Sequence, residues 1–245
     1  SSTTSTFVVT ASDGTNTSTR QYTITVNPAY VQLSGSGTWS VPSGINSAEI
    51  LIVAGGASGS RSPNVAGGGG GAGGIVHRTS YTFTATDKSS GIAYVVGAGG
   101  DGVGTGSGNS YDGGYRNGGD TTFAISGGTI TAKGGGGGAG YGGNSPHLSG
   151  FSQAYYAASQ GGSGGGGAWE QTNGAASNQG TFSGWTKYGN AGGNRASGEN
   201  YSAAGGGGAG GAGQNSTATV GGAGGVGQLF SSFTAYGESG YFGGG

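Results

Sequence analysis

Residues 133–140 read Lys-Gly-Gly-Gly-Gly-Gly-Ala-Gly, and this stretch decides which folds the chain can adopt. Glycine loses more conformational freedom on folding than any other residue, and each one disfavours an α-helix by about 1 kcal/mol relative to alanine. Collagen requires glycine at every third position and much proline, whereas this run is uninterrupted and the chain has only 4 prolines. The remaining ordered conformation is polyglycine II, with three residues per turn, a rise of about 3.1 Å and no internal hydrogen bonds.

Glycine-rich runs recur along the chain and indicate a bundle of such helices. Their N–H and C=O groups point outward and can pair with a neighbouring run, which the absence of Cβ allows to approach closely. Ala72, Ala139 and Ala209 fit as small residues on the outer ridges. The spacing is irregular, so a solenoid of fixed period is not expected. The runs lie at residues 67–71, 97–100, 134–138, 164–167, 205–208 and 221–225.

Between residues 29 and 132 the sequence is rich in Val, Ile, Thr and Tyr, which favours strands, and it has no helical periodicity of useful length. We expect a turn at residues 86–88 and a two-residue hairpin at Gly127-Gly128. The predicted fold class is therefore all-β plus a polyglycine-II helix bundle, a glycine-rich sandwich with essentially no α-helix. The expected strands are residues 30–33, 38–41, 48–54, 75–85, 92–96, 121–125 and 129–132.

The first 28 residues differ from the rest of the chain. Strand patterns at residues 7–11 and 20–26 flank Asp13-Gly14, a turn signal. Two strands alone are marginal in water, so we interpret residues 1–28 as the C-terminal hairpin of a truncated Ig-like or cadherin-like domain, a spacer. Because the chain starts without Met and ends inside a glycine run, we expect it to be part of a longer protein. The predicted division is 1–28, a β-rich part at 29–132, and polyglycine-II runs with aromatic and polar loops at 133–245.

Composition limits the classes of function. Glycine supplies 67 of 245 residues, a content that often signals disorder, but only 7% of residues are charged and 10% are aromatic, which favours an ordered chain. The net charge of −1 and the scattered basic residues disfavour nucleic-acid binding. No apolar run reaches the about 18 residues of a membrane span, so membrane insertion is not expected. The absence of cysteine excludes disulfides and thiolate metal sites.

Catalytic and cofactor motifs are weak. Residues 97–102 match G-x-G-x-x-G after a strand, but the glycine-rich sequence that follows is no helix, so a dinucleotide site is rejected. His77 is expected at the surface of a strand, and Asp112 and Asp120 are interpreted as turn residues. No acidic pair suggests acid–base chemistry and no calcium-loop pattern is present. We therefore expect no catalytic residue, no cofactor, no metal and no enzymatic activity.

The order of motifs resembles the glycine-rich domain of phage tail and tail-fibre proteins. The resemblance covers about residues 30–245 and is specific as an ordered series rather than for any single run. It rests on Gly-Thr-Trp-Ser-Val-Pro-Ser-Gly at 37–44, Ala-Glu-Ile-Leu-Ile-Val-Ala-Gly-Gly at 48–56, the glycine run and Ile-Val at 67–76, Tyr-Val-Val-Gly-Ala-Gly-Gly at 94–100, Asn-Gly-Gly-Asp-Thr-Thr-Phe at 117–123 and Ala-Lys-Gly at 132–134.

The chain is similar in style to the T-even-type tail-fibre tip adhesins. That resemblance implies a stacked polyglycine-II sandwich whose distal loops bind bacterial outer-surface receptors. The glycine-rich extracellular region of certain receptor tyrosine kinases uses similar packing, so the fold does not fix the function. The Ig-like hairpin and the longer β part depart from the adhesin pattern and leave the position in a fibre open.

Between the glycine runs, aromatic residues stand among Ser, Asn, Gln and Gly. This is the composition of an antibody combining site, where rigid rings supply contact area and small polar residues adapt, and it also suits sugar rings. The alternative interpretation is that the rings cover the glycine layers and shield backbone hydrogen bonds. The candidate receptor-binding residues are Tyr111, Tyr115, Arg116, His147, Phe151, Tyr155, Tyr156, Trp169, Trp185, Tyr188 and Tyr201.

The favoured hypothesis is a receptor-binding module of a phage tail fibre. It would act outside the cell, on a virion or cell surface, and bind a host glycan or outer-surface protein. Other fibre subunits would be its partners, in a homotrimer if the fibre is trimeric as many are. The alternative is a structural subunit or spacer of an extracellular filament or fibre, in which the hairpin could donate a strand to a neighbour. An enzyme would require a hydrolytic pair that converges in space.

Overall fold

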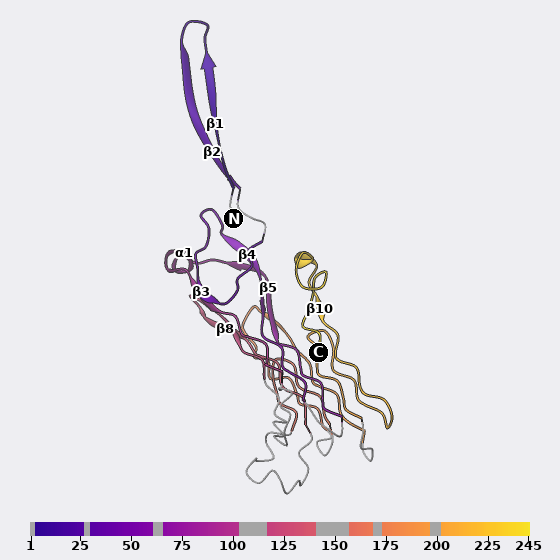
Figure 1. Ribbon diagram of the computed structural model, residues 1–245. Helices are drawn as coiled ribbons and strands as arrows, with labels where there is room; N and C mark the ends of the chain where they lie inside the picture. The colour runs from indigo at the N-terminus through magenta and orange to yellow at the C-terminus, as the bar shows by residue number, and fades with distance from the viewer. Residues whose placement is uncertain are drawn as a thin grey trace.

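The molecule has three parts in Figure 1: a long N-terminal hairpin, a group of short antiparallel sheets, and extended glycine-rich segments that run away from the sheets. The prediction of a β-rich chain with essentially no α-helix is confirmed, since the described residues contain one α-helix, of six residues. The computed structural model describes residues 3–26, 30–60, 66–102, 117–140, 157–168, 173–196 and 202–245.

The predicted N-terminal hairpin is present. Strands β1 (Thr3–Ser12) and β2 (Thr17–Val26) pair in unbroken antiparallel register and are longer than expected. The turn forms because Asp13 Oδ1 accepts the backbone N–H groups of Thr15 at 2.9 Å and Asn16 at 2.6 Å. Gly14 has a φ of 91°, which side-chain-bearing residues rarely adopt.

A four-stranded antiparallel sheet holds the middle of the chain in the order β3-β6-β7-β8. A hairpin between the last two strands is present as predicted, but its two-residue loop is Ser126-Gly127 rather than Gly127-Gly128, because Gly128 already pairs with Ile125 as the first residue of β8. Trp39, Ile92 and Phe123 from this sheet enter the main core. The strands are β3 (Ser36–Trp39), β6 (Ile92–Val95), β7 (Thr121–Ile125) and β8 (Gly128–Ala132).

A second antiparallel sheet has the order β4-β5-β9, so β4 is an edge strand. One face, with Ile52, Val76 and Tyr81, packs against the four-stranded sheet in the main core. The other face carries Leu51 and Ile75 and packs under the C-terminal segment. The strands are β4 (Ser47–Val53), with a bulge between Ala48 and Ile50, β5 (Ile75–Thr82) and β9 (Thr186–Tyr188).

The C-terminal segment forms a cover that the sequence did not predict. It contains β10 (Gln228–Leu229), the 3₁₀ turn η2 (Ser231–Phe233) and β11 (Tyr241–Phe242), and it lies beside β5 in Figure 1. Phe230 is the buried centre of this cover, with its ring centroid 5.2 Å from that of Tyr188 and 5.0 Å from that of His77.

Two local predictions are wrong. The expected turn at residues 86–88 is a short helix, α1 (Ala85–Ser90), which begins at a capping box between Thr84 and Asp87. Residues 30–33 form no strand and are paired with none. Ring contacts from Tyr30 to Phe233 at 6.3 Å and Tyr236 at 5.9 Å position the segment in place of strand pairing.

The glycine-rich runs bond to one another at every third residue. Residues 68–74 form a central run that pairs with residues 54–60, 133–139, 163–166 and 204–207. This step of three is the step of a polyglycine-II helix, whose conformation remains our prediction for these runs. The N–H to O bonds of the central run with its first two neighbours are Ala54 to Gly74, Ala57 to Gly71, Ser60 to Gly68, Gly68 to Ala139, Gly71 to Gly136 and Gly74 to Lys133, at 2.8–3.1 Å.

Candidate binding surface at the ends of the glycine runs

The glycine runs end next to one another, on the side away from the sheets. The Ser60 backbone N–H bonds to Gly68 O, the Gly68 N–H to Ala139 O, and the Ala139 N–H to Gly166 O, at 3.1, 2.8 and 2.9 Å. The Ser60 hydroxyl donates to the same Ala139 carbonyl. A continuous chain of hydrogen bonds therefore ties the ends of four separate runs together.

The later runs join the same network. The Gly167 N–H bonds to Gly193 O at 3.0 Å, and the Ala204 N–H bonds to Gly167 O at 2.9 Å. Beside them, the buried Ser216 hydroxyl is bonded to the Ser202 hydroxyl at 3.1 Å and accepts the Ala196 N–H at 3.1 Å. We call this set of bonded residues, from Ser60 to Ser216, the run-end network.

Most candidate receptor-binding residues lie in segments that adjoin this network in the sequence. Their sequence neighbours Ala139, Gly167, Ala196 and Ser202 belong to it, and Asn117 is bonded beside it through its side chain to the Gly137 N–H at 2.9 Å. The candidates that fall outside the described residues are Tyr111, Tyr115, Arg116, His147, Phe151, Tyr155, Tyr156, Trp169 and Tyr201.

Trp185 lies at the sheets, away from the run-end network. It precedes β9, is half-buried, and packs with its ring centroid 6.0 Å from that of Tyr81. The Arg78 guanidinium stands over both rings, 5.8 Å from the centroid of Trp185 and 5.3 Å from that of Tyr81. These contacts are typical of a side chain that stabilises the sheet.

Tyr188 packs on the opposite face of the same sheet. It pairs with Ile75 across β5 and β9 and meets Phe230 edge-on at 5.2 Å. The structure therefore does not bring Trp185 and Tyr188 together, because one joins the main core and the other the C-terminal cover.

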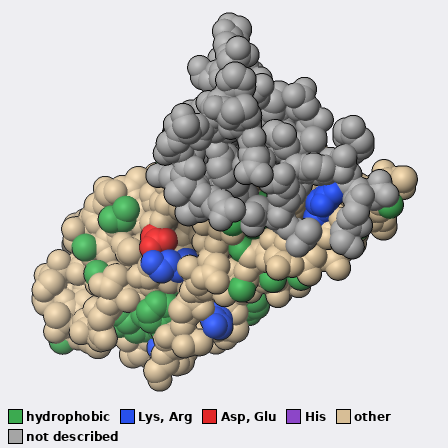
Figure 2. Space-filling model, turned by 90° about the horizontal axis from the view of Figure 1, so that it is seen from below, with side chains coloured by type: hydrophobic (Ala, Val, Ile, Leu, Met, Phe, Trp, Pro, Cys, Tyr) green, Lys and Arg blue, Asp and Glu red, His purple; other side chains and the backbone are tan. Residues whose placement is uncertain are grey.

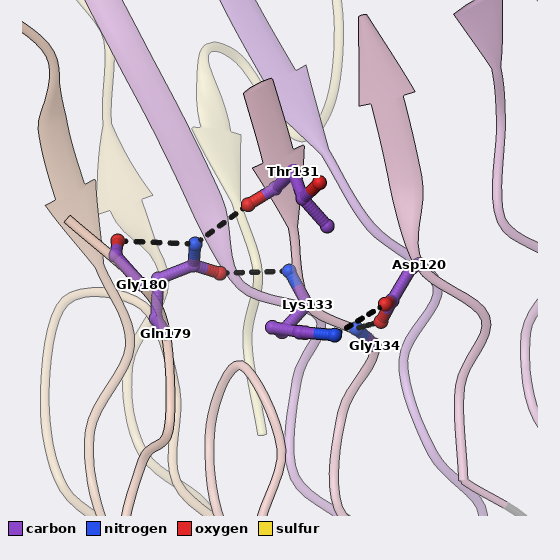
Figure 3. Close-up of polar contacts among 6 residues, drawn as sticks. All are labelled: Asp120, Thr131, Lys133, Gly134, Gln179 and Gly180. Carbon is purple, nitrogen blue, oxygen red and sulfur yellow. Dashed lines mark hydrogen bonds and ion pairs between the residues drawn. The ribbon is translucent and has the colours of Figure 1, made fainter. Parts of the chain in front are cut away.

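A polar junction, buried at Gln179 and partly exposed at Asp120 and Lys133, fixes the glycine runs to the strands (Figure 3). Gln179 is 4% exposed; its Oε1 accepts the Lys133 N–H at 2.8 Å and its Nε2 donates to Thr131 O at 3.0 Å. Asp120 accepts the Lys133 ammonium at 2.7 Å and the Gly134 N–H at 2.8 Å. Asp120 thus ties the start of β7 to the glycine run that begins at Lys133, which differs from the turn role expected of it.

The same contacts set the charge of Asp120. Burial raises the pKa of its carboxyl, but the hydrogen bond from Lys133, the Gly134 N–H and the Lys133 charge together outweigh burial and leave the pKa lowered. Asp120 is therefore held ionised where the strands pass into the glycine runs.

The prediction that His77 lies at the surface is wrong. The residue is 9% exposed because the C-terminal cover places Phe230 over that face of β5. His77 Nε2 lies 2.7 Å from Glu49 Oε1, and Glu49 occupies the β4 bulge. Glu49 also lines a hollow of about 710 Å³ along β4. The sequence did not predict this hollow, because its lining comes from segments that are far apart along the chain.

Charge is sparse on the described surface. On the face seen in Figure 2 the basic and acidic side chains are few and form no continuous patch. Within the described ranges, no helix has both the length and the apolar character to cross a membrane.

Comparison with known proteins gives one match. A family model described as a glycine-rich domain matches residues 31–245. No curated protein and no solved structure matches the chain. The family match begins after the N-terminal hairpin and includes both the sheets and the glycine runs.

Proposed function

The chain belongs to the glycine-rich domain family, and from that premise we propose that it is a receptor-binding module of a phage tail fibre or a similar surface adhesin. The observation that carries the proposal is the run-end network. It gathers the flanking residues of several aromatic-rich segments at one end of the molecule. Binding residues commonly sit on connecting segments held by a rigid scaffold.

The scaffold is suited to that role because its rigidity comes from backbone bonding. The central run is bonded to four neighbours, so the described ends have little freedom to separate. Segments that start from fixed ends can vary in sequence without disturbing the packing beneath them. Tyr155, Tyr156 and Trp169 supply rings in those segments, and their Ser, Gly, Gln and Asn neighbours supply adaptable hydrogen bonds.

The receptor class follows from the residue types. Tyr and Trp faces beside amides and hydroxyls fit sugar rings or a polar protein surface, whereas a nucleic acid would require the basic patch that the sequence lacks. We therefore propose a cell-surface glycan or outer-surface protein as the ligand, bound outside the cell.

A second candidate function is a structural subunit of an extracellular filament or fibre. The exposed N-terminal hairpin favours it, because a two-stranded hairpin with apolar residues on its surface is typical of a segment that meets a partner. The two functions act at different parts of the molecule and can coexist.

The test is binding of the purified, fluorescently labelled chain to a panel of intact bacterial cells. The variant Tyr155→Ala/Tyr156→Ala/Trp169→Ala removes rings from the proposed surface. The control variant Tyr22→Ala removes an exposed ring from the hairpin. Thermal unfolding of all three proteins checks that they fold alike.

Saturable binding that the triple variant loses and Tyr22→Ala retains would support the proposal. Competition by free surface glycans, or loss after protease treatment of the cells, would then assign the receptor class. Absence of saturable binding across the panel, with the chain folded, would overturn the proposal and favour the structural subunit.

A further inference from the structure

The N-terminal hairpin presents an apolar face that nothing in the described chain covers. Phe7 lies opposite Tyr22, with ring centroids 5.6 Å apart, and both share a face with Val9 and Ile24. Their exposed fractions are 44%, 43%, 48% and 54% in the order Phe7, Tyr22, Val9, Ile24. The opposite face is mostly threonine. A two-stranded hairpin is marginal alone, and its unpaired edges are a template for further strands.

The hollow of about 710 Å³ follows the free edge of β4. All seven β4 residues line it, and because side chains alternate across a strand, a hollow that touches every residue must run along the edge. The opposite wall is formed by Tyr94 and Val96 of the four-stranded sheet region, and one end by Phe233 and Tyr236. We call this hollow the β4 groove.

Backbone groups of β4 point into this groove. The Ala54 N–H bonds to Gly74 O at 3.1 Å and continues the β4–β5 ladder, so the alternate residues Leu51 and Val53 direct their N–H and C=O groups to the free edge. The Thr121 hydroxyl donates to Val53 O at 2.8 Å, as this alternation requires. Leu51 therefore offers a donor and an acceptor to an added strand.

We propose that strand β2 of a second copy of this chain occupies the β4 groove and extends the sheet by strand addition. Its alternating pattern places Tyr22 and Ile24 on one face, to meet the apolar lining, and the threonines on the other. Charge supports the pairing: Arg20 is the one basic residue of the hairpin strands, and Glu49 is the one charged residue among those that line the groove. Glu49 Oε1 contacts His77 Nε2, and the Glu49 side chain keeps 28% of its surface exposed.

The assembly is head-to-tail, since the donor hairpin and the acceptor groove are different surfaces. Such contacts build open chains, or rings where the rotation closes. This inference goes beyond receptor binding, because it links copies through the hairpin and leaves the run-end network free. It does not depend on the proposed receptor.

The chain has no cysteine, so introduced cysteines give unambiguous cross-links. The donor variant is Ile24→Cys and the acceptor variant is Val96→Cys, both at exposed positions, the second lining the groove. A short bismaleimide can join the two thiols in more than one strand register. Each single variant, their mixture, and the double variant Ile24→Cys/Val96→Cys are treated and resolved by size under denaturing conditions.

The expected result is dimer only in the mixture of single variants and a ladder of multimers for the double variant. Position 24 carries the cysteine in the cross-linking experiment, so the effect of Ile24→Lys is measured separately. The matched variants Ile24→Lys and Thr23→Lys, on opposite faces of β2, are compared by light scattering without cross-linker. Ile24→Lys should lose the concentration-dependent rise in mass that Thr23→Lys keeps.

Three outcomes would overturn the inference. Dimerisation of the Ile24→Cys chain alone would show hairpin-to-hairpin pairing instead. An internally cross-linked monomer from the double variant would show that the hairpin folds onto its own chain. A constant monomer mass at the highest soluble concentration would show that no assembly forms. Cell binding of Ile24→Lys is measured separately. Retained cell binding with lost assembly would show that the receptor proposal and the assembly inference succeed or fail independently.

Discussion

The Tyr81 hydroxyl donates a 2.8 Å hydrogen bond to the buried carboxylate of Asp87. The same carboxylate accepts the Thr84 N–H at 2.9 Å and the Ser126 N–H at 2.7 Å. One side chain thus joins β5, the start of α1 and the turn between β7 and β8, and so it connects the two sheets at the end opposite to the glycine runs.

Replacement of Asp87 should therefore loosen the sheets as a unit. We expect Asp87→Ala to lower the free energy of unfolding by about 2–4 kcal/mol, because it leaves several buried donors without an acceptor. Chemical denaturation followed by tryptophan fluorescence measures this. Asp13→Ala is the control, since Asp13 bonds only within the hairpin turn among the described contacts; an equal loss there would contradict the assignment.

Acid should destabilise the protein through the same group. Burial raises the pKa of Asp87, but hydrogen bonds from Thr84, Ser126 and Tyr81 outweigh it and leave the pKa lowered. A lowered folded pKa contributes stability above the unfolded value and loses it as pH falls through the folded value. Unfolding midpoints between about pH 6 and pH 2 should fall steeply below about pH 4.

Two variants test which carboxyl group causes the fall in stability at acid pH. Asp87→Asn should flatten the slope more than Asp120→Asn does, because the Asp120 side chain is 41% exposed and solvent screens its pairing with Lys133. If both variants kept the parental slope, other carboxyl groups would have to account for the acid sensitivity.

The glycine runs should reject even one methyl group at their centre. A Cβ at Gly206 would overlap the carbonyl oxygen of Gly70, so Gly206→Ala is expected to cost more than about 3 kcal/mol or to prevent folding. At Gly99 the nearest atom to a Cβ is the Gly56 oxygen at 3.8 Å, and Gly99→Ala should be nearly neutral. Thermal unfolding compares them, and equal midpoints would contradict close packing at Gly206.

Trp185 should contribute to stability through packing. We expect Trp185→Ala to lower the free energy of unfolding by about 2–3 kcal/mol, because the ring packs on Tyr81 beneath the Arg78 guanidinium. Trp185→Phe should retain part of that contact. A Trp185→Ala protein that keeps its stability but binds cells less well would instead support a role of Trp185 in receptor binding.

The sequence predicted the parts of the fold that carry long local patterns. Residues 121–125 form a strand as predicted, and a hairpin follows it with its loop one residue earlier than expected, at Ser126-Gly127. The two- and three-residue strands β9, β10 and β11 are too short to show a period. The α1 helix is one and a half turns long, and its Thr84–Asp87 cap resembles a turn signal because the same residue types form both.

The candidate site was predictable in composition and less so in position. Glycine runs and ring-bearing segments can be read from residue types, whereas the burial of His77 depends on Phe230, a residue from the far end of the chain. The β4 groove likewise depends on which edge of β4 stays unpaired, and pairing order between distant strands leaves no local trace.

Hydrogen bonding between the glycine runs at every third residue limits which substitutions the protein can accept during evolution. A core of leucines and valines tolerates exchange of one shape for another, because neighbours can repack. Where backbone meets backbone, as between Gly70 and Gly206, there is no smaller residue to substitute and no side chain to adjust. We therefore expect sequence variation in the connecting segments. The packed glycine positions should accept almost no substitution, because a single added side chain prevents the runs from packing.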